Sequence, residues 1–120
     1  MNHNLELSVF EIVGSGLCVA SDDGQKVFAR IAAAIREEQK VKVSFLNVSS
    51  LTSAFLNAAI GQLYGSFSAE EIRSKLAVKD MEPDDKELLK RVVDTAKDYF
   101  KNPAVHKKAA RDMFGGANEQ

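Results

Sequence analysis

The chain has 120 residues, 45% of them hydrophobic and 28% charged, with a formal net charge of −1 and one cysteine. This length and composition fit one domain with a real core, and they exclude wholesale disorder, an internal disulfide and any electrostatic reason to bind nucleic acid or a membrane. The N-terminus lacks the basic and apolar regions of a signal peptide, so we expect a cytoplasmic protein.

The first forty residues predict two strands and a helix. Apolar residues recur from Leu5 to Val13 and favour an N-terminal strand, and a glycine-rich turn at 14–16 leads into a short strand at 17–20. Ser21-Asp22-Asp23-Gly24 has the pattern of a helix start, because carboxylates are favourable near the positive end of the helix dipole. We expect this helix to end near Gln39 and the central strand to follow it.

Residues 43–69 contain no Asp, Glu, Lys or Arg, which is unusual in so charged a chain. The stretch opens as a strand around Val43 and Phe45, passes through a polar segment and continues as a helix over 52–67. One side of this helix is apolar. The other side, where a surface helix normally carries charges, has the small uncharged residues Ala54, Ala58, Gly61 and Gly65, with Asn57 beside them. We therefore expect another element of the chain, or a partner, to cover that face.

The last fifty residues predict mainly helices. Ser68 and Glu71 have the spacing of a capping box, so a short helix should follow, and then a short strand at 76–78. Pro83 in a first-turn position predicts a long helix, and Pro103 restarts a last helix over 103–114, before a tail over 115–120 that should fray. The alternation predicts an α/β fold with a mixed sheet of about four strands, helices mainly on one face and additional C-terminal helices, in one domain over 1–120.

No residue pattern supports catalysis, a cofactor or a metal centre. Neither His3 nor His106 has a partner at ligand spacing, and no phosphate-binding loop is present. An acidic run and a basic patch are both more typical of solvated surface than of ion or phosphate sites: Asp80, Glu82, Asp84 and Asp85 for the first, and Lys101, Lys107, Lys108 and Arg111 for the second. We therefore expect a protein that is not an enzyme.

Hydroxyl side chains are concentrated where the central strand gives way to the uncharged helix: Ser49, Ser50, Thr52 and Ser53. Hydroxyls in this position cap the first N–H groups of a helix, which accounts for about two of the four. A phosphoryl group here would add about two negative charges to a surface that has none, and such a change can switch a docking surface.

The segment from Val43 to Leu63 resembles the core of a STAS domain, the fold of bacterial anti-sigma factor antagonists. That family has a hydrophobic strand, followed by an Asp-Ser-Ser-Gly-Leu segment that leads into a helix of small residues. The matching residues here are Val43-Ser44-Phe45-Leu46-Asn47-Val48 and Leu51-Thr52-Ser53-Ala54-Phe55-Leu56. The chain is also similar, over roughly residues 5–100, to small bacterial STAS-like proteins, through Ser21-Asp22-Asp23-Gly24 and Ile60-Gly61-Gln62-Leu63-Tyr64.

This resemblance implies a STAS-like fold, and it aligns Ser53 with the serine that is phosphorylated in the antagonists. Thr52 stands where the family has Asp, and Phe55 where it has Gly, and both departures favour a capping role for Ser53 over phosphorylation.

The combined prediction is a regulatory domain that docks a protein partner, and the family implies a histidine-kinase-like ATPase or another partner-switching regulator. The expected docking surface is the start and outer face of the helix over 52–67, formed by Ser50, Thr52, Ser53, Ala54, Asn57, Ala58 and Gly61. Three alternatives stay open: a sensor of a small ligand or nucleotide at the strand ends near Ser50 and Ser53, an enzyme with an unrecognised site, and a homodimer formed through the uncharged helix.

Overall fold

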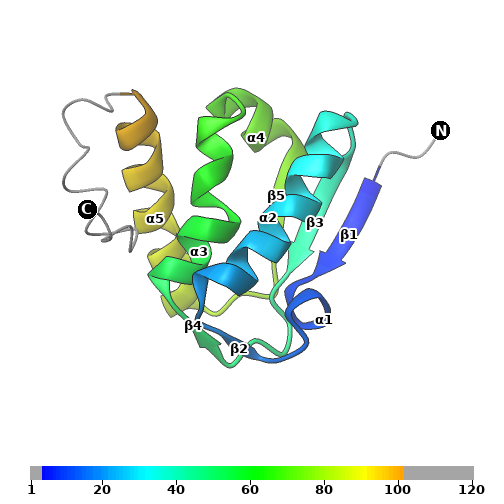
Figure 1. Cartoon of the computed structure of the whole chain (residues 1–120), viewed down its shortest axis with the longest axis vertical. Coiled ribbons are helices and arrows are strands. Elements are labelled where there is room, and N and C mark those ends of the chain that lie inside the picture. Colours follow the sequence, from blue (N-terminus) through cyan, green and yellow to red (C-terminus); the bar gives the residue numbers. More distant parts are fainter. Residues whose placement is uncertain (1–3, 102–120) are drawn as a thin grey trace.

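The computed structural model describes residues 4–101, in which strands and helices alternate along the chain (Figure 1). The elements, in order, are β1 (Asn4–Ser8), α1 (Val9–Val13), β2 (Leu17–Cys18), α2 (Ser21–Arg36), β3 (Lys40–Ser44), β4 (Ser50–Leu51), α3 (Ser53–Ala59), the 3-10 helix η1 (Gly61–Gly65), α4 (Ala69–Lys75), β5 (Leu76–Lys79) and α5 (Pro83–Lys101). The predicted α/β class is confirmed. The helix expected over 103–114 and the tail over 115–120 lie outside the described residues.

Two parallel sheets stand in place of the expected mixed sheet. The larger sheet has the strand order β1-β3-β5, and the smaller one pairs β2 with β4. Register places three sets of residues side by side across the larger sheet: Leu5, Val41 and Leu76; Glu6, Lys42 and Ala77; and Leu7, Val43 and Val78. Because side chains alternate between faces along a strand, one face of this sheet is apolar and the other is polar.

Helices cover the apolar face of the larger sheet. Strand β3 lies beside β1 and β5 lies beside β3, so successive strands extend the sheet in one direction. Because the crossovers between parallel strands have the same hand, every connecting helix lies on the same face. Figure 1 shows α2, α3 and α4 on that side, with α5 beyond them. The opposite face carries exposed Glu6, Lys42 and Ala77. The prediction that helices pack mainly on one face is therefore confirmed.

The core lies between the apolar sheet face and α2 and α3. Among the described residues Phe55 is the largest fully buried side chain, and it lies in one cluster with Ile31 and Ile35 of α2 and with Val41 and Val43 of β3. On the far side of α3, helix α5 adds Val92 and Ala96, which are 1% and 0% exposed. Helix α3 is thus enclosed by α2 on one side and by α5 on another.

The N-terminal strand is shorter than predicted. It ends at Ser8, whose Oγ accepts a hydrogen bond from the Glu11 N–H at 3.1 Å and so caps α1. Gly14, with φ of 85°, ends that helix in the left-handed region that glycine adopts freely. The apolar residues after Val9 therefore belong to one turn of helix rather than to a strand, and the short strand expected at 17–20 is reduced to β2.

The helix predicted over 52–67 is two elements. Helix α3 ends at Ala59, Ile60 departs from helical geometry with φ of −122°, and the chain continues as η1. Two glycines, Gly61 and Gly65, bound η1, and glycine is a poor helix former.

The predicted start of α4 is confirmed, because the Glu71 N–H donates to Ser68 Oγ at 3.0 Å. The prediction that a long helix begins at Pro83 is also confirmed, as is the strand that starts at Leu76. At α2, Asp22 and Asp23 occupy the first turn as expected, although the N-cap position is Ala20 and not Ser21.

Candidate functional site

The carboxyl ends of the three main strands point toward the small sheet of β2 and β4, at the bottom of Figure 1. Strand β2 pairs with β4 through Leu17 with Ser50 and Cys18 with Leu51. Thr52 extends this pairing, because its N–H donates to the Cys18 carbonyl at 3.3 Å and its hydroxyl donates to the Val19 carbonyl at 2.7 Å. The start of α3 is thereby fixed to β2.

Thr52 also caps α3. The Phe55 N–H donates to Thr52 Oγ1 at 3.2 Å, so one hydroxyl both receives this bond and donates to β2. Ser53, the first residue of α3, is half-buried, and its hydroxyl makes no hydrogen bond within residues 4–101. The capping role predicted for Ser53 is therefore wrong, since the preceding threonine fills it.

Because Thr52 caps α3 and Ser53 does not, alanine substitutions at the two positions should differ in their effect on stability. Thr52→Ala removes the cap and the bond to β2, so we expect the free energy of unfolding to fall by about 1–2 kcal/mol. Ser53→Ala removes no hydrogen bond and should change stability by less than about 0.5 kcal/mol. Urea denaturation measures both, and an equal loss for the two variants would contradict the capping assignment.

Most of the predicted docking face is covered by the chain itself. Asn57 and Ala58 are 6% and 7% exposed, and Gly61 is also buried. A Cβ on Gly24 of α2 would lie 2.8 Å from Ala58 Cβ, and a Cβ on Gly61 would lie 3.4 Å from Val92 of α5. Helices α2 and α5 thus occupy the space proposed for a partner, and docking through Asn57, Ala58 and Gly61 is a wrong prediction.

The same burial removes the basis for a homodimer formed through this helix. Four of the predicted residues remain half-exposed at the start of α3: Ser50, Thr52, Ser53 and Ala54. The hollow at the amino ends of the main strands and the hollow between α4 and α5 both lie away from these four residues.

Sequence reasoning missed the exposed apolar side chains at this end. Phe10, Leu17, Val19 and Leu46 are 37%, 60%, 46% and 59% exposed. A Cβ on Gly16 would lie 2.6 Å from the Asn47 carbonyl oxygen, so the backbone segments that carry Leu17 and Leu46 are in close contact. Phe10 and Leu46 each stand two residues beyond a paired residue at the end of β1 and β3. We call Phe10, Leu17, Val19 and Leu46, with Ser50 and Ser53, the carboxyl-end surface.

A signal for two of these residues was present in the sequence. Leu17 and Val19 flank Cys18 at a spacing of two, so a strand that buries Cys18 directs both neighbours to the other face. In the structure Cys18 is 0% exposed.

A known protein family matches most of the segment that forms this site. The family described as "STAS-like domain of unknown function (DUF4325)" matches residues 23–86, slightly more than half of the chain. The chain belongs to this family. It is a STAS-like domain, as its sequence resemblance and its α/β architecture both indicated. The matched region begins in α2 and includes Thr52, Ser53 and the whole of α3. Neither the curated proteins nor the solved structures contained a significant match.

The thiol of the STAS-like domain is poorly suited to nucleophilic chemistry. Burial, with a smaller contribution from the negative charge of Asp23, raises the pKa of Cys18 to about 11. Its proton therefore stays on at neutral pH, and the thiolate required for attack is scarce. Cys18 is thus a free thiol that is buried in the core.

Neither a metal-ligating group nor a membrane-spanning helix is found among the described residues. Within residues 4–101, no group of three or more His, Cys, Asp or Glu side chains could hold a metal ion. Over the same residues, no helix combines the length and the apolar character that crossing a membrane requires.

Proposed function

We propose that this STAS-like domain is a non-catalytic regulatory module that docks a protein partner through its carboxyl-end surface. The observation that supports this is the exposure of Phe10, Leu17, Val19 and Leu46, the large hydrophobic side chains that the described residues leave open to solvent. Large exposed apolar side chains at one end of a small domain are typical of interaction surfaces, because burial of each group by a partner is favourable.

The proposed partner has a complementary apolar patch with hydrogen-bonding groups at its rim. The apolar residues of the surface supply the buried centre of the contact, and the half-exposed Ser50 and Ser53 supply polar groups beside it. A histidine-kinase-like ATPase, or another regulator that exchanges partners, is the candidate that the family resemblance favours.

Ser53 is the proposed point of regulation. Its hydroxyl has no hydrogen bond within the described chain, and it follows the residue that anchors α3 to β2. A phosphoryl group there would add about two negative charges beside the apolar residues of the surface, and desolvating those charges would oppose docking. Intact-mass measurement of protein isolated from its native cell tests this step, and Ser53→Ala provides the matched unmodifiable control.

The docking proposal is tested by placing a carboxylate on the surface. Leu17→Asp combined with Leu46→Asp should weaken partner binding by at least about tenfold, because an unpaired charge would be buried at the centre of the contact. Both side chains are largely exposed, so the variant should fold. Binding is measured with the partner recovered by wild-type bait from the native cell and then purified.

Ala33→Asp is the control, since Ala33 is exposed on α2 and outside the carboxyl-end surface. We expect this control to bind the partner as the wild type does. Unchanged affinity of the Leu17 and Leu46 variant would refute docking at this surface, and an equal loss in the control would show that added negative charge alone is responsible.

A further inference from the structure

The apolar face of the larger sheet is less well covered at its β5 edge than at its centre. Val41 and Val43 of the central strand are 2% and 0% exposed. Leu76 and Val78 stand beside them in register on β5, yet both are only half-buried. Strand β5 is an edge strand of this sheet, and residues of α4 and α5 line the space over its apolar face.

This space is a hollow of about 220 Å³ between α4 and α5. Most of its lining is apolar and comes from the end of α3, from α4, from β5 and from α5: Ile60, Ile72, Leu76, Val78, Leu89 and Val93. Ala69, the first residue of α4, borders the same space with only a methyl group. Because water occupies about 30 Å³ per molecule, the hollow has room for a ligand of about ten non-hydrogen atoms.

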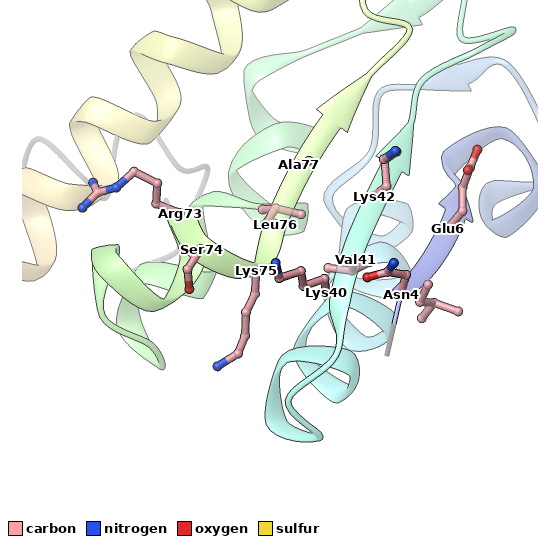
Figure 2. Close-up of a pocket in the computed structure, with 11 residues that line it drawn as sticks. Asn4, Glu6, Lys40, Val41, Lys42, Arg73, Ser74, Lys75, Leu76 and Ala77 are labelled. Atoms are coloured by element: carbon pink, nitrogen blue, oxygen red, sulfur yellow. The ribbon is translucent and has the colours of Figure 1, made fainter. Parts of the chain in front are cut away.

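Three polar side chains from three elements stand at the rim of this hollow: Tyr64 of η1, Arg73 of α4 and Lys97 of α5. The Lys97 Nζ lies 5.8 Å from the centre of the Tyr64 ring, which is a cation–π contact. Figure 2 shows Arg73 extending from α4 toward α5 and away from Lys40 and Lys42. Two cations from different helices are therefore directed to the same side of the hollow.

The charges at the rim favour an anion. Burial raises the pKa of the Tyr64 phenol, the positive charge of Arg73 opposes this rise, and the Asp94 carboxylate adds to it. The phenol therefore keeps its proton at neutral pH and can donate a hydrogen bond. Asp94 is bound to Lys90 at 2.8 Å, and neither Arg73 nor Lys97 forms an ion pair with another residue of the described range.

We propose that the hollow between α4 and α5 binds a small amphipathic carboxylate, with its apolar body on the floor and its anionic group at the rim. The planar guanidinium of Arg73 can hold both carboxylate oxygens, and Lys97 supplies a second positive charge. The floor supplies the remaining affinity, because burial of an apolar body is favourable. An apolar lining with a few converging polar groups is typical of small-molecule sites.

This hollow has no residue in common with the carboxyl-end surface, so the proposal does not rest on protein docking. Residues 102–120, which follow α5 directly, are the other candidate to fill it. They carry three basic and two acidic side chains, which gives no charge complementarity to a rim with two cations. We therefore favour a separate, negatively charged ligand over this segment.

Sodium octanoate is the probe that tests this site, because it joins one carboxylate to an apolar chain of the appropriate size. Its binding to the full chain is measured by titration calorimetry, and its position by NMR contacts between its methylene groups and the methyl groups of Val78, Leu89 and Val93. Octanamide lacks the charge and acetate lacks the apolar body. We expect each of these two to bind at least about tenfold more weakly than octanoate.

Two sets of variants separate the contributions of the rim and the floor. Arg73→Gln combined with Lys97→Gln should weaken octanoate binding by at least about tenfold, and it should leave the fold intact because both side chains are exposed. Ala69→Leu leaves the charge unchanged but fills the hollow, so octanoate binding should be lost.

The matched control is Lys86→Gln combined with Arg91→Gln, which removes two exposed cations of α5 that lie outside the hollow. This control should bind octanoate as the wild type does. The proposal is overturned by an equal loss in the control, by full binding in the Ala69 variant, or by octanamide binding as tightly as octanoate. It is also overturned if about 10 mM octanoate does not bind, or if its NMR contacts lie at the carboxyl-end surface instead.

Discussion

Gly24→Ala is expected to destabilise the domain, although alanine normally stabilises a helix by about 1 kcal/mol relative to glycine. Gly24 lies inside α2, where α2 meets α3, and a Cβ there would lie 2.6 Å from the Phe55 carbonyl oxygen and 2.8 Å from Ala58 Cβ. The first of these atoms belongs to the backbone, so relief requires the two helices to move apart. We expect a net loss of about 2 kcal/mol, and a larger loss for Gly24→Val.

Urea denaturation measures this loss as a lower midpoint with an unchanged slope. Gln25→Ala is the matched control, because Gln25 is the next residue of the same helix and is exposed. That variant should differ from the wild type by less than about 0.5 kcal/mol. A stabilised Gly24→Ala variant would mean that α2 and α3 are farther apart than the structure shows.

Ala58→Arg is expected to unfold the domain. Ala58 is 7% exposed and lies against Gly24, so a guanidinium at this position would have neither space nor water. Burying an unpaired charge costs several kcal/mol, which is comparable with the whole stability of a domain of this size. Circular dichroism and the dispersion of amide NMR signals would show the loss of structure directly.

Ala33→Arg is the matched control, because it introduces the same side chain at an exposed position of α2 and should leave the fold intact. A folded Ala58→Arg variant would contradict the burial of this helix face. If that folded variant also lost its partner, docking through the face of small residues would return in place of the carboxyl-end surface.

Local patterns predicted the helices well because each depends on residues near one another in the chain. The acidic first turn of α2, the cap at Ser68 and the proline at the start of α5 were all recognised on that basis. The apolar residues around Val43 and Phe45 likewise predicted the central strand, which is β3. Strand direction has no such local signal. The parallel pairing within each of the two sheets follows from helical crossovers that only the assembled chain reveals.

The candidate site was harder to predict for the same reason. Residues 43–69 lack charge, and this showed that something covers the small residues of α3, but it did not show what. Gly24 was the missing indication, since a glycine inside a helix often marks a close approach, and here it admits Ala58. Leu17 and Leu46 are far apart in the sequence, and the segments that carry them meet only in the folded chain, where Gly16 approaches Asn47 and accepts hydrogen bonds from the N–H groups of Ser49 and Ser50.

The double role of the Thr52 hydroxyl has a mechanical consequence. The Thr52 oxygen accepts from the Phe55 N–H in the first turn of α3, and its hydroxyl donates to the Val19 carbonyl. Separation of β2 from α3 therefore disturbs the hydroxyl that caps the helix. The two segments should consequently open and close as a single cooperative unit, with the amide protons of Thr52 and Phe55 exchanging at matched rates. A displacement of Leu17 or Val19 by a bound partner should therefore move the first turn of α3 together with β2.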